Sequence, residues 1–262
     1  MHPLLFELHL GGLTIPFHTY GLMIAIGFVL GVVTVRKLAI RAGMDPDQCA
    51  DLAFWLLLLG FVGSRVLFIL TRLPYFLSNP LDMFKVWEGG LVFFGGLLLS
   101  TGYAVWYFKK FKLNAWKMID VLSPGLVIAH AFGRLGCLSA GCCYGRPTAA
   151  PWGIRLDSEL VDFSLRGIPL HPTQLYEFTA LLLLYFGLIQ VFKHKKIDGQ
   201  VGLTYFMTYP LIRSVIEVFR GDSIRGFVLE GILSTSQFIS ALVFLVALLV
   251  LNLRLKTAAR QK

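Results

Sequence analysis

The chain has 262 residues, of which 56% are hydrophobic, 14% aromatic and only 15% charged. Ordinary soluble domains carry about 25% charged residues, so the composition excludes a typical water-soluble globule. Several apolar runs of about 18 residues or more are long enough to cross a bilayer, and no Pro-rich or Ser-rich linker separates them. We therefore predict one all-α integral membrane domain over residues 1–262. The net charge of +9 does not point to nucleic acid, because most basic residues gather in short segments between apolar runs.

Seven apolar runs predict seven transmembrane helices. Only helices and closed barrels satisfy the backbone in lipid, and these runs lack the alternating pattern of barrel strands. The runs cover residues 20–35, 52–70, 90–107, 118–135, 175–192, 201–219 and 232–253. Residues 1–17 contain no basic n-region and no small-residue cleavage site, so we expect the first span to be retained.

The distribution of basic residues predicts the orientation. One set of connecting segments holds fourteen of them: Arg36, Lys37, Arg41, Lys109, Lys110, Lys112, Lys117, Lys193, Lys195, Lys196, Arg254, Lys256, Arg260 and Lys262. The alternate set holds seven: Arg72, Lys85, Arg146, Arg155, Arg166, Arg220 and Arg225. By the positive-inside rule the N-terminus lies outside and the C-terminus in the cytoplasm. Residues 141–170 then form a small periplasmic head between the fourth and fifth helices.

Six charged residues fall inside or at the ends of the predicted spans: Arg65, Asp120, Arg134, Glu177, Arg213 and Glu217. A charge at the centre of a membrane helix costs about 2.5–3.5 kcal/mol on insertion scales, so each needs a partner, an aqueous cavity or a function. One interpretation is structural, because three arginines can neutralise three acids in ion pairs between helices.

The positions of two arginines favour a functional interpretation. Arg134 and Arg213 both lie toward the outer side of the predicted bundle, and Glu217 follows Arg213 by one helical turn. The arginine side chain presents a rigid fork of donors that matches phosphate oxygens. Converging arginines at this depth predict a site for the phosphate of a phospholipid headgroup in the outer leaflet.

Three motifs carry most of the remaining polar residues. They are GRLGCLSAGCCYGR at 133–146, HPTQLYE at 171–177 and LIRSVIEVFRGD at 211–222, the last followed by LSTSQ at 233–237. With HTYG at 18–21, GSR at 63–65, WEGG at 87–90 and GG at 95–96, their order resembles the prolipoprotein diacylglyceryl transferase family of the bacterial inner membrane. The resemblance covers nearly the whole chain.

The resemblance implies transfer of the sn-1,2-diacylglyceryl group of phosphatidylglycerol to the lipobox cysteine of a preprolipoprotein signal peptide, with glycerol phosphate released. It implies a multi-pass membrane enzyme whose partners are membrane lipid and these peptides, without a cofactor; the oligomeric state is open. Arg134 and Arg213 would stabilise the departing phosphate. The other residues it assigns are Glu217, as the residue that orients Arg213, Tyr20, as a hydrogen-bonding catalytic group, and Asp120, His18 and Gly145, as substrate-binding residues.

The sequence departs from the family pattern at the expected base. The family commonly has Ser-Phe-His-Gly-Gly where this chain has Val-Phe-Phe-Gly-Gly at 92–96, so Phe94 replaces a histidine. His130, one turn before Arg134, is our candidate for a catalytic base, and a packing histidine is the alternative. A third route needs no base, because a substrate thiol is already partly thiolate at neutral pH.

Cys137, Cys142 and Cys143 replace or adjoin polar residues of the family signature. We expect them to be structural, with a disulfide from Cys137 to Cys142 or Cys143, since vicinal cysteines rarely bond each other. We expect no metal, because there is no Cys-x-x-Cys pair and no fourth ligand at suitable spacing. Two alternatives remain: a membrane thiol–disulfide oxidoreductase, which would leave the arginines unused, and an altered paralogue that binds lipid without catalysis.

Overall fold

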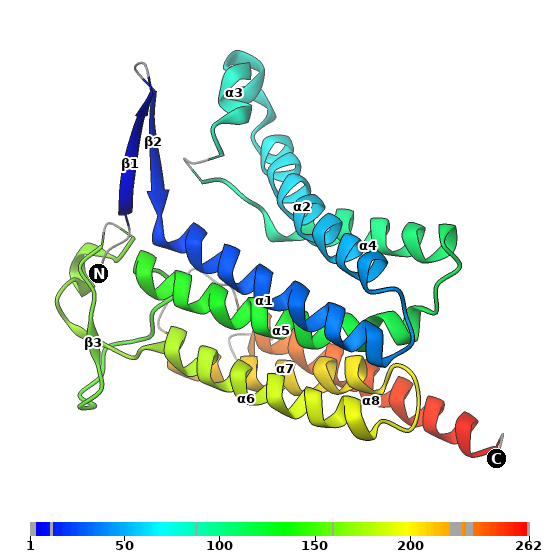
Figure 1. The fold of residues 1–262 in the computed structure, drawn as a ribbon. Helices are drawn as coiled ribbons and strands as arrows, with labels where there is room; N and C mark the ends of the chain where they lie inside the picture. Colours follow the sequence, from blue (N-terminus) through cyan, green and yellow to red (C-terminus); the bar gives the residue numbers. More distant parts are fainter. Residues whose placement is uncertain are drawn as a thin grey trace. The chain divides into compact units, whose positions relative to one another are not determined.

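The structure is a computed structural model that describes residues 4–10, 13–86, 89–158, 160–220, 227–228 and 233–260. A hairpin of β1 (Leu4–Leu10) and β2 (Leu13–His18) leads into α1 (Thr19–Arg41). Next come α2 (Pro46–Thr71), α3 (Leu73–Ser78), the 3-10 helix η1 (Pro80–Phe84), α4 (Phe93–Lys110) and α5 (Ala115–Ala140). The chain continues through β3 (Ile154–Arg155), η3 (Phe163–Leu165), β4 (Pro169–Leu170), α6 (Thr173–His194), α7 (Gln200–Phe219), β5 (Phe227–Val228), β6 (Leu233–Ser234) and α8 (Thr235–Arg260) (Figure 1).

The long helices follow the predicted apolar runs in order. Within the described ranges α1, α2, α5, α6 and α8 are long and apolar enough to cross a membrane. α4, which ends in Lys109 and Lys110, and α7, which contains Arg213 and Glu217, are not among them. The predicted class, a helical integral membrane protein, is confirmed at this level. The three two-stranded sheets are additions that the apolar pattern did not predict.

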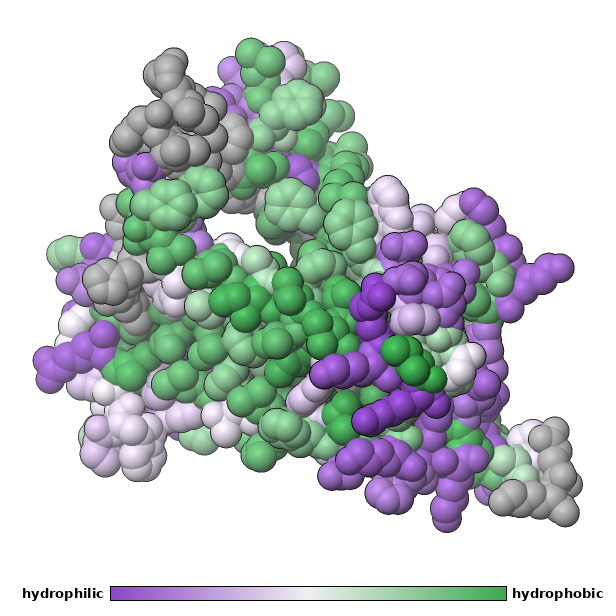
Figure 2. Space-filling model, viewed as in Figure 1, coloured by the Kyte–Doolittle hydropathy of each residue, from purple (hydrophilic) through white to green (hydrophobic). Residues whose placement is uncertain are grey.

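The outer surface of the helices is apolar, as a lipid-facing surface requires. Leu183 and Phe186 on α6 and Leu245 and Leu249 on α8 are all at least 60% exposed. Figure 2 shows hydrophobic side chains over the middle of α6 and hydrophilic side chains gathered near the end of α8. Large apolar patches of this kind are rare on soluble monomers, which supports the membrane assignment.

The chain forms two compact units, residues 35–118 and residues 1–34 with 119–262. In the first of these, α2 packs closely against α4. A Cβ atom added to Gly63 would lie 2.5 Å from the carbonyl oxygen of Gly95 and 2.8 Å from Cβ of Leu99. No side chain fits at that contact, and small residues allow this close backbone approach between membrane helices.

Arg65, on α2, is a structural residue of the same unit. Its side chain is buried and donates to five backbone carbonyls, those of Asp82, Met83, Lys85, Gly89 and Gly90, over 2.6 to 3.2 Å. The guanidinium group therefore fixes the described part of the segment between η1 and α4, where its acceptors are backbone carbonyls.

The larger unit contains most of α1 and α5 with α6, α7 and α8. Its core includes Val127 and Ala131 of α5 and Leu181 and Leu188 of α6, none of which has exposed surface. Thr34 of α1 lies 3.2 Å from the hydroxyl of Tyr185 on α6. The packing of α6 on α7 places the polar residues described below between neighbouring helices.

Asp120 determines where α7 begins. Its side chain is fully buried near the start of α5, where Oδ1 accepts from the backbone N–H groups of Val201 (2.8 Å) and Gly202 (3.1 Å). Oδ2 accepts from the backbone N–H of Gly199 (2.9 Å) and from Nζ of Lys195 (2.7 Å). These are the N–H groups that an isolated helix leaves unsatisfied, so Asp120 caps α7 from another helix.

The segment between α5 and α6 has a small core of its own. Leu156, Val161 and Leu170 are buried there, with Tyr144 and Leu165 packed against them. Antiparallel pairing of β3 with β4 closes this segment. It corresponds to the predicted head at 141–170, and it joins α6 through a hydrogen bond from Trp152 Nε1 to the hydroxyl of Tyr176 (2.7 Å).

Candidate functional site

A buried group of polar side chains from three helices, here called the arginine site, consists of His130 and Arg134 of α5, Glu177 of α6, and Tyr209, Arg213 and Glu217 of α7. Residues four apart lie on one face of a helix. The spacing 130–134 on α5 and 209–213–217 on α7 therefore aligns each set along one stripe. The site arises where those two stripes meet Glu177.

Glu177 connects the three helices. It is 1% exposed, and its Oε1 lies 3.0 Å from Nη2 of Arg134. The hydroxyl of Tyr209 donates to the same oxygen at 3.3 Å. Because a buried carboxylate is stable only when its charge and lone pairs are satisfied, Glu177 fixes the position of Arg134 and couples α5, α6 and α7.

Arg213 has a buried donor that none of the residues described by the structure accepts from. Its Nη2 pairs with Oε2 of Glu217 at 2.5 Å, and the side chain is only 13% exposed. Its Nη1 is buried and has no hydrogen-bond partner among the described residues. An unsatisfied buried donor costs about 1–3 kcal/mol, more when charged, so its presence indicates a ligand acceptor.

His130 lies beside Arg134 and Tyr209. Its Nε2 is 3.3 Å from Nε of Arg134, which can only donate, and 3.2 Å from Nη2 of the same residue. Its ring meets that of Tyr209 edge to face at 5.2 Å. The Nε2 lone pair is therefore an acceptor for Arg134, which holds the guanidinium group in place but occupies the position where a base would take a proton.

Tyr20 and His18 lie at the start of α1. The ring of Tyr20 packs against Gly136 of α5 and is 41% exposed, and the charge of Arg134 reaches its hydroxyl. His18, the last residue of β2, is exposed. The structure thus places Tyr20 beside the end of α5 that carries His130 and Arg134. No described contact joins His18 to the arginine site.

Asp120 and Gly145, which the resemblance assigns to substrate binding, both make contacts within the fold. Asp120 sits fourteen residues before Arg134 on α5, roughly 20 Å away along the helix, and its oxygens are all engaged in capping α7. Gly145 donates its N–H to the carbonyl of His171 at 2.9 Å, and a Cβ there would lie 2.6 Å from the carbonyl oxygen of Phe219. The fold requires glycine at this position because no side chain fits.

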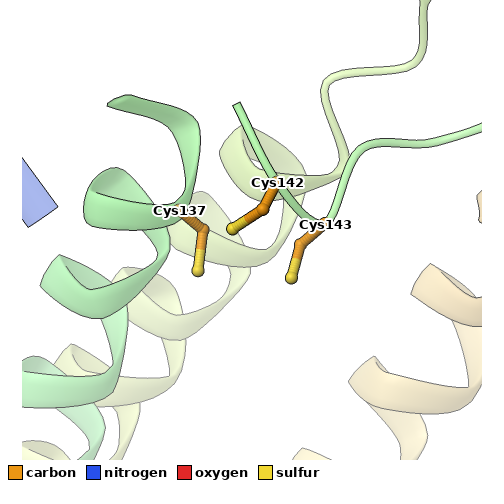
Figure 3. Close-up of side chains that lie close together, drawn as sticks. All are labelled: Cys137, Cys142 and Cys143. Atoms are coloured by element: carbon orange, nitrogen blue, oxygen red, sulfur yellow. The ribbon is translucent and has the colours of Figure 1, made fainter. Parts of the chain in front are cut away.

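Three thiols lie beside the arginine site, and we call Cys137, Cys142 and Cys143 the thiol cluster. No two of their Sγ atoms are more than 4.8 Å apart. Figure 3 shows Cys137 near the end of α5 and the other two in the following turn, with all three sulfur atoms on the same side. All are free cysteines, so the disulfide expected from the sequence is absent.

Arg220, directly after α7, adds positive charge next to the cluster. Hydrogen bonds with the other two cysteines, together with the nearby guanidinium group of Arg220, lower the pKa of the Cys143 thiol. The charge of Arg220 also acts on Arg213. The sequence reading placed Arg220 in an outer connecting segment and gave it no role.

The sequence reading also missed the roles of Glu177 and Tyr209. Glu177 was recognised only as an intramembrane acid, and Tyr209 was not noticed. The four-residue spacing of Tyr205, Tyr209, Arg213 and Glu217 is a signal that could have identified Tyr209, since it places all four on one helical face.

Together these observations define a helical membrane protein with a buried arginine–carboxylate site. The family model described as prolipoprotein diacylglyceryl transferase matches residues 3–253, and the chain belongs to that family. It is similar to the phosphatidylglycerol–prolipoprotein diacylglyceryl transferase of Clostridium tetani, with 34% identity over 253 residues, 97% of this chain and 98% of the relative.

Other relatives carry the same name. The protein of Geobacter sulfurreducens is 36% identical over 238 residues, 88% of each chain, and that of Finegoldia magna is 31% identical over 238 residues, 90% of each. The resemblance drawn from the motifs is confirmed, and none of these three relatives is named as a thiol–disulfide oxidoreductase.

Proposed function

We propose that this chain transfers the diacylglyceryl group of phosphatidylglycerol to the lipobox cysteine thiol of preprolipoproteins, the first step of lipoprotein maturation. The names of its relatives state both substrates. In this reaction the thiol sulfur forms a bond to the terminal glyceryl carbon. The bond from that carbon to the phosphate oxygen breaks, and glycerol phosphate leaves with the electron pair.

The buried Nη1 of Arg213, for which the described part of the chain offers no acceptor, is the observation that carries this proposal. A phosphodiester oxygen supplies the acceptor that this buried donor lacks. A fork of two N–H groups matches the spacing of two phosphate oxygens, and hydrogen bonds between charged groups are about twice as strong as neutral ones. Glu217 holds Nη2 and thereby sets the direction in which Nη1 points.

Arg134 adds a second positive charge that can stabilise the departing glycerol phosphate. Arg134 and the hydroxyl of Tyr209 both contact Oε1 of Glu177, and Arg213 follows Tyr209 by one helical turn, so both arginines belong to one site. Glu177 and Glu217 balance these two charges before substrate binds, and Arg220 adds one more positive charge nearby. The negative charge that develops on the phosphate in the transition state therefore meets pre-positioned cations, which is the largest single contribution in many enzymes.

The same proposal includes seven spans with the N-terminus outside. The site then lies toward the outer leaflet, the head at 141–170 lies in the periplasm, and the enzyme resides in the bacterial inner membrane. Fourteen basic residues on one side against seven on the other support this orientation. A signal peptide whose cysteine emerges at the outer surface would reach the site from that side.

Replacement of the arginines tests the proposal. Arg134→Gln and Arg213→Gln should each lower transfer from phosphatidylglycerol vesicles to a lipobox peptide by about 10²-fold or more, because each removes a charged donor to the leaving group. Arg213→Lys should restore only part of the rate, since an ammonium group lacks the planar fork. In complementation of a conditional transferase-deficient bacterium, the wild-type chain should support growth best, Arg213→Lys less well and the two Gln variants least.

Arg254→Gln is the matched control, because Arg254 lies at the far end of α8 and donates to the carbonyl of Asp198. It should transfer at the wild-type rate. Near-normal transfer by both glutamine variants, with each protein present in the membrane fraction, would refute the proposed role of the arginines.

A further inference from the structure

The thiol cluster is the feature that the proposed function leaves unused. Its three sulfur atoms lie within 4.8 Å of one another and all three residues are half-buried. Thiolate sulfur atoms that surround a zinc ion tetrahedrally at about 2.3 Å lie roughly 3.8 Å apart. Small side-chain rotations would bring the three sulfur atoms to that spacing, whereas a disulfide would use only two of them.

The backbone around the cluster is held by buried side chains of α6. Thr173 Oγ1 donates to the carbonyl of Cys143, and Gln174 Nε2 donates to the carbonyl of Cys142, both at 2.7 Å. Thr173 and Gln174 are each 1% exposed. The N–H of Cys142 bonds back to the carbonyl of Cys137 at 3.1 Å. The three thiols are therefore positioned by hydrogen bonds that do not involve sulfur.

Cys143 adopts a conformation that side-chain-bearing residues rarely take. Its φ is 63°, and Gly141, two residues earlier, has a φ of 76°. A non-glycine residue in this region costs of order 1 kcal/mol or more, and such strain is concentrated at functional sites. Here the left-handed turn directs the thiols of Cys142 and Cys143 back toward Cys137.

No further ligand completes the cluster within the described residues: no His, Asp or Glu there joins the three cysteines. Structural zinc sites have four protein ligands, whereas catalytic ones have three and keep the fourth position open. Arg134 lies one helical turn before Cys137 on α5, so its positive charge offsets part of the negative charge of three thiolates around one divalent cation. The arrangement matches an open zinc site.

We propose that Cys137, Cys142 and Cys143 bind one zinc ion whose open fourth position takes the thiol of the lipobox cysteine. This inference rests on the proposed function. A metal-bound thiol loses its proton outright, so the proton goes to solvent and the bound thiolate attacks the glyceryl carbon. The C–S bond forms, the C–O bond breaks and glycerol phosphate leaves toward the arginines. The step is redox-neutral, and the zinc ion is unchanged.

Zinc would also explain how transfer proceeds with Nε2 of His130 already accepting from Arg134. No protein side chain needs to take the thiol proton, because the metal lowers the pKa of the thiol it binds. The zinc ligand Cys137 and the phosphate-binding Arg134 would then lie on neighbouring turns of α5, which brings the bound lipobox thiolate close to the phosphate.

The first test measures metal binding by the reduced, detergent-solubilised full chain after removal of metals with a chelator. One zinc per chain should bind, and Co²⁺ in its place should give the absorption bands of a tetrahedral thiolate site. Cys49→Ser, which changes the buried cysteine of α2, should bind equally, whereas Cys142→Ser and Cys143→Ser should not. Absence of stoichiometric zinc in the folded wild-type protein, binding of Cu⁺ but not zinc, or a disulfide within the cluster would overturn the proposal.

The second test concerns the open position. A lipobox peptide should change the Co²⁺ spectrum, and the same peptide with serine for cysteine should not. Zinc removal should lower transfer by about 10²-fold, and added zinc should restore it. Full transfer by zinc-free protein would overturn this inference and leave the proposed function intact. Peptide-dependent Co²⁺ spectra without any transfer from phosphatidylglycerol would instead support the thiol site and refute the proposed function.

Discussion

His130 shows, at the residue scale, how one hydrogen bond limits the chemistry of a titratable side chain. The sequence makes it a candidate base because it precedes Arg134 by one turn. In the structure its Nε2 accepts from Nε of Arg134, an atom that cannot accept. A proton acceptor must have a free lone pair within reach of the substrate, so the contact favours a positioning role for His130.

A pair of substitutions distinguishes these roles. His130→Gln should retain transfer within a few-fold, since an amide oxygen can replace Nε2 as the acceptor for Arg134. His130→Leu should lose about 10-fold or more, because a hydrogen bond to a charged group contributes roughly 1.5–3 kcal/mol. The pH–rate profile of the Gln variant should match the wild type. A 10²-fold loss in that variant with a flattened profile would restore the base role.

Among the secondary-structure elements, α5 and α7 are joined by the side chain of Asp120. Asp120 accepts four hydrogen bonds at the start of α7. Asp120→Asn should lower the thermal unfolding midpoint in detergent, because it replaces a charged acceptor by an amide and leaves buried N–H groups poorly satisfied. Transfer per folded molecule should stay unchanged. An increased KM for phosphatidylglycerol at unchanged thermal stability would instead support the substrate-binding role that the family resemblance implied.

The ion pair at the same cap adds a dependence on pH. Burial opposes the charge of Lys195, but its hydrogen bonds and ion pairs with Asp120 and Asp198 outweigh burial and raise its pKa. The folded state therefore binds this proton more tightly than the unfolded state. The resulting stabilisation is complete below the ordinary lysine pKa of about 10.5 and is lost as pH rises through the folded-state value.

A comparison of wild type with Lys195→Met across alkaline pH checks this sign. The difference in unfolding midpoint should be constant up to about pH 10, should shrink as the pH rises toward the folded-state pKa of Lys195, and should be absent above it. Lys196→Met is the control, because Lys196 is exposed, and it should show no such trend. A difference that grows with pH would contradict the argument.

At the scale of the whole molecule, the orientation is the property with the clearest test. Ser164 in the head and Lys196 between α6 and α7 are both exposed. Ser164→Cys should react with a membrane-impermeant maleimide in spheroplasts, and Lys196→Cys only after permeabilisation. The native cysteines provide the background, which the unsubstituted chain measures. The reverse pattern would invert the proposed topology.

The sequence by itself determined the class of protein, the order of the helices and the family. These properties follow from local quantities: a run of apolar residues is hydrophobic whatever it packs against, and the charge of a connecting segment is the sum of its own residues. The helices extend beyond the predicted runs because caps set their ends. Asp45, for example, accepts from the N–H groups of Asp47 and Gln48 and begins α2 six residues before the predicted span.

Only the tertiary structure decided which charged residues act together. Arg65, Asp120 and Arg134 looked alike as intramembrane charges, yet the first binds backbone carbonyls, the second caps a helix and the third pairs with Glu177. These roles depend on partners from other helices or from segments distant in sequence. The spacing of residues along one helix does not reveal which partners those are. The convergence of three thiols is a further case, since it depends on a left-handed turn that α6 holds in place through Thr173 and Gln174.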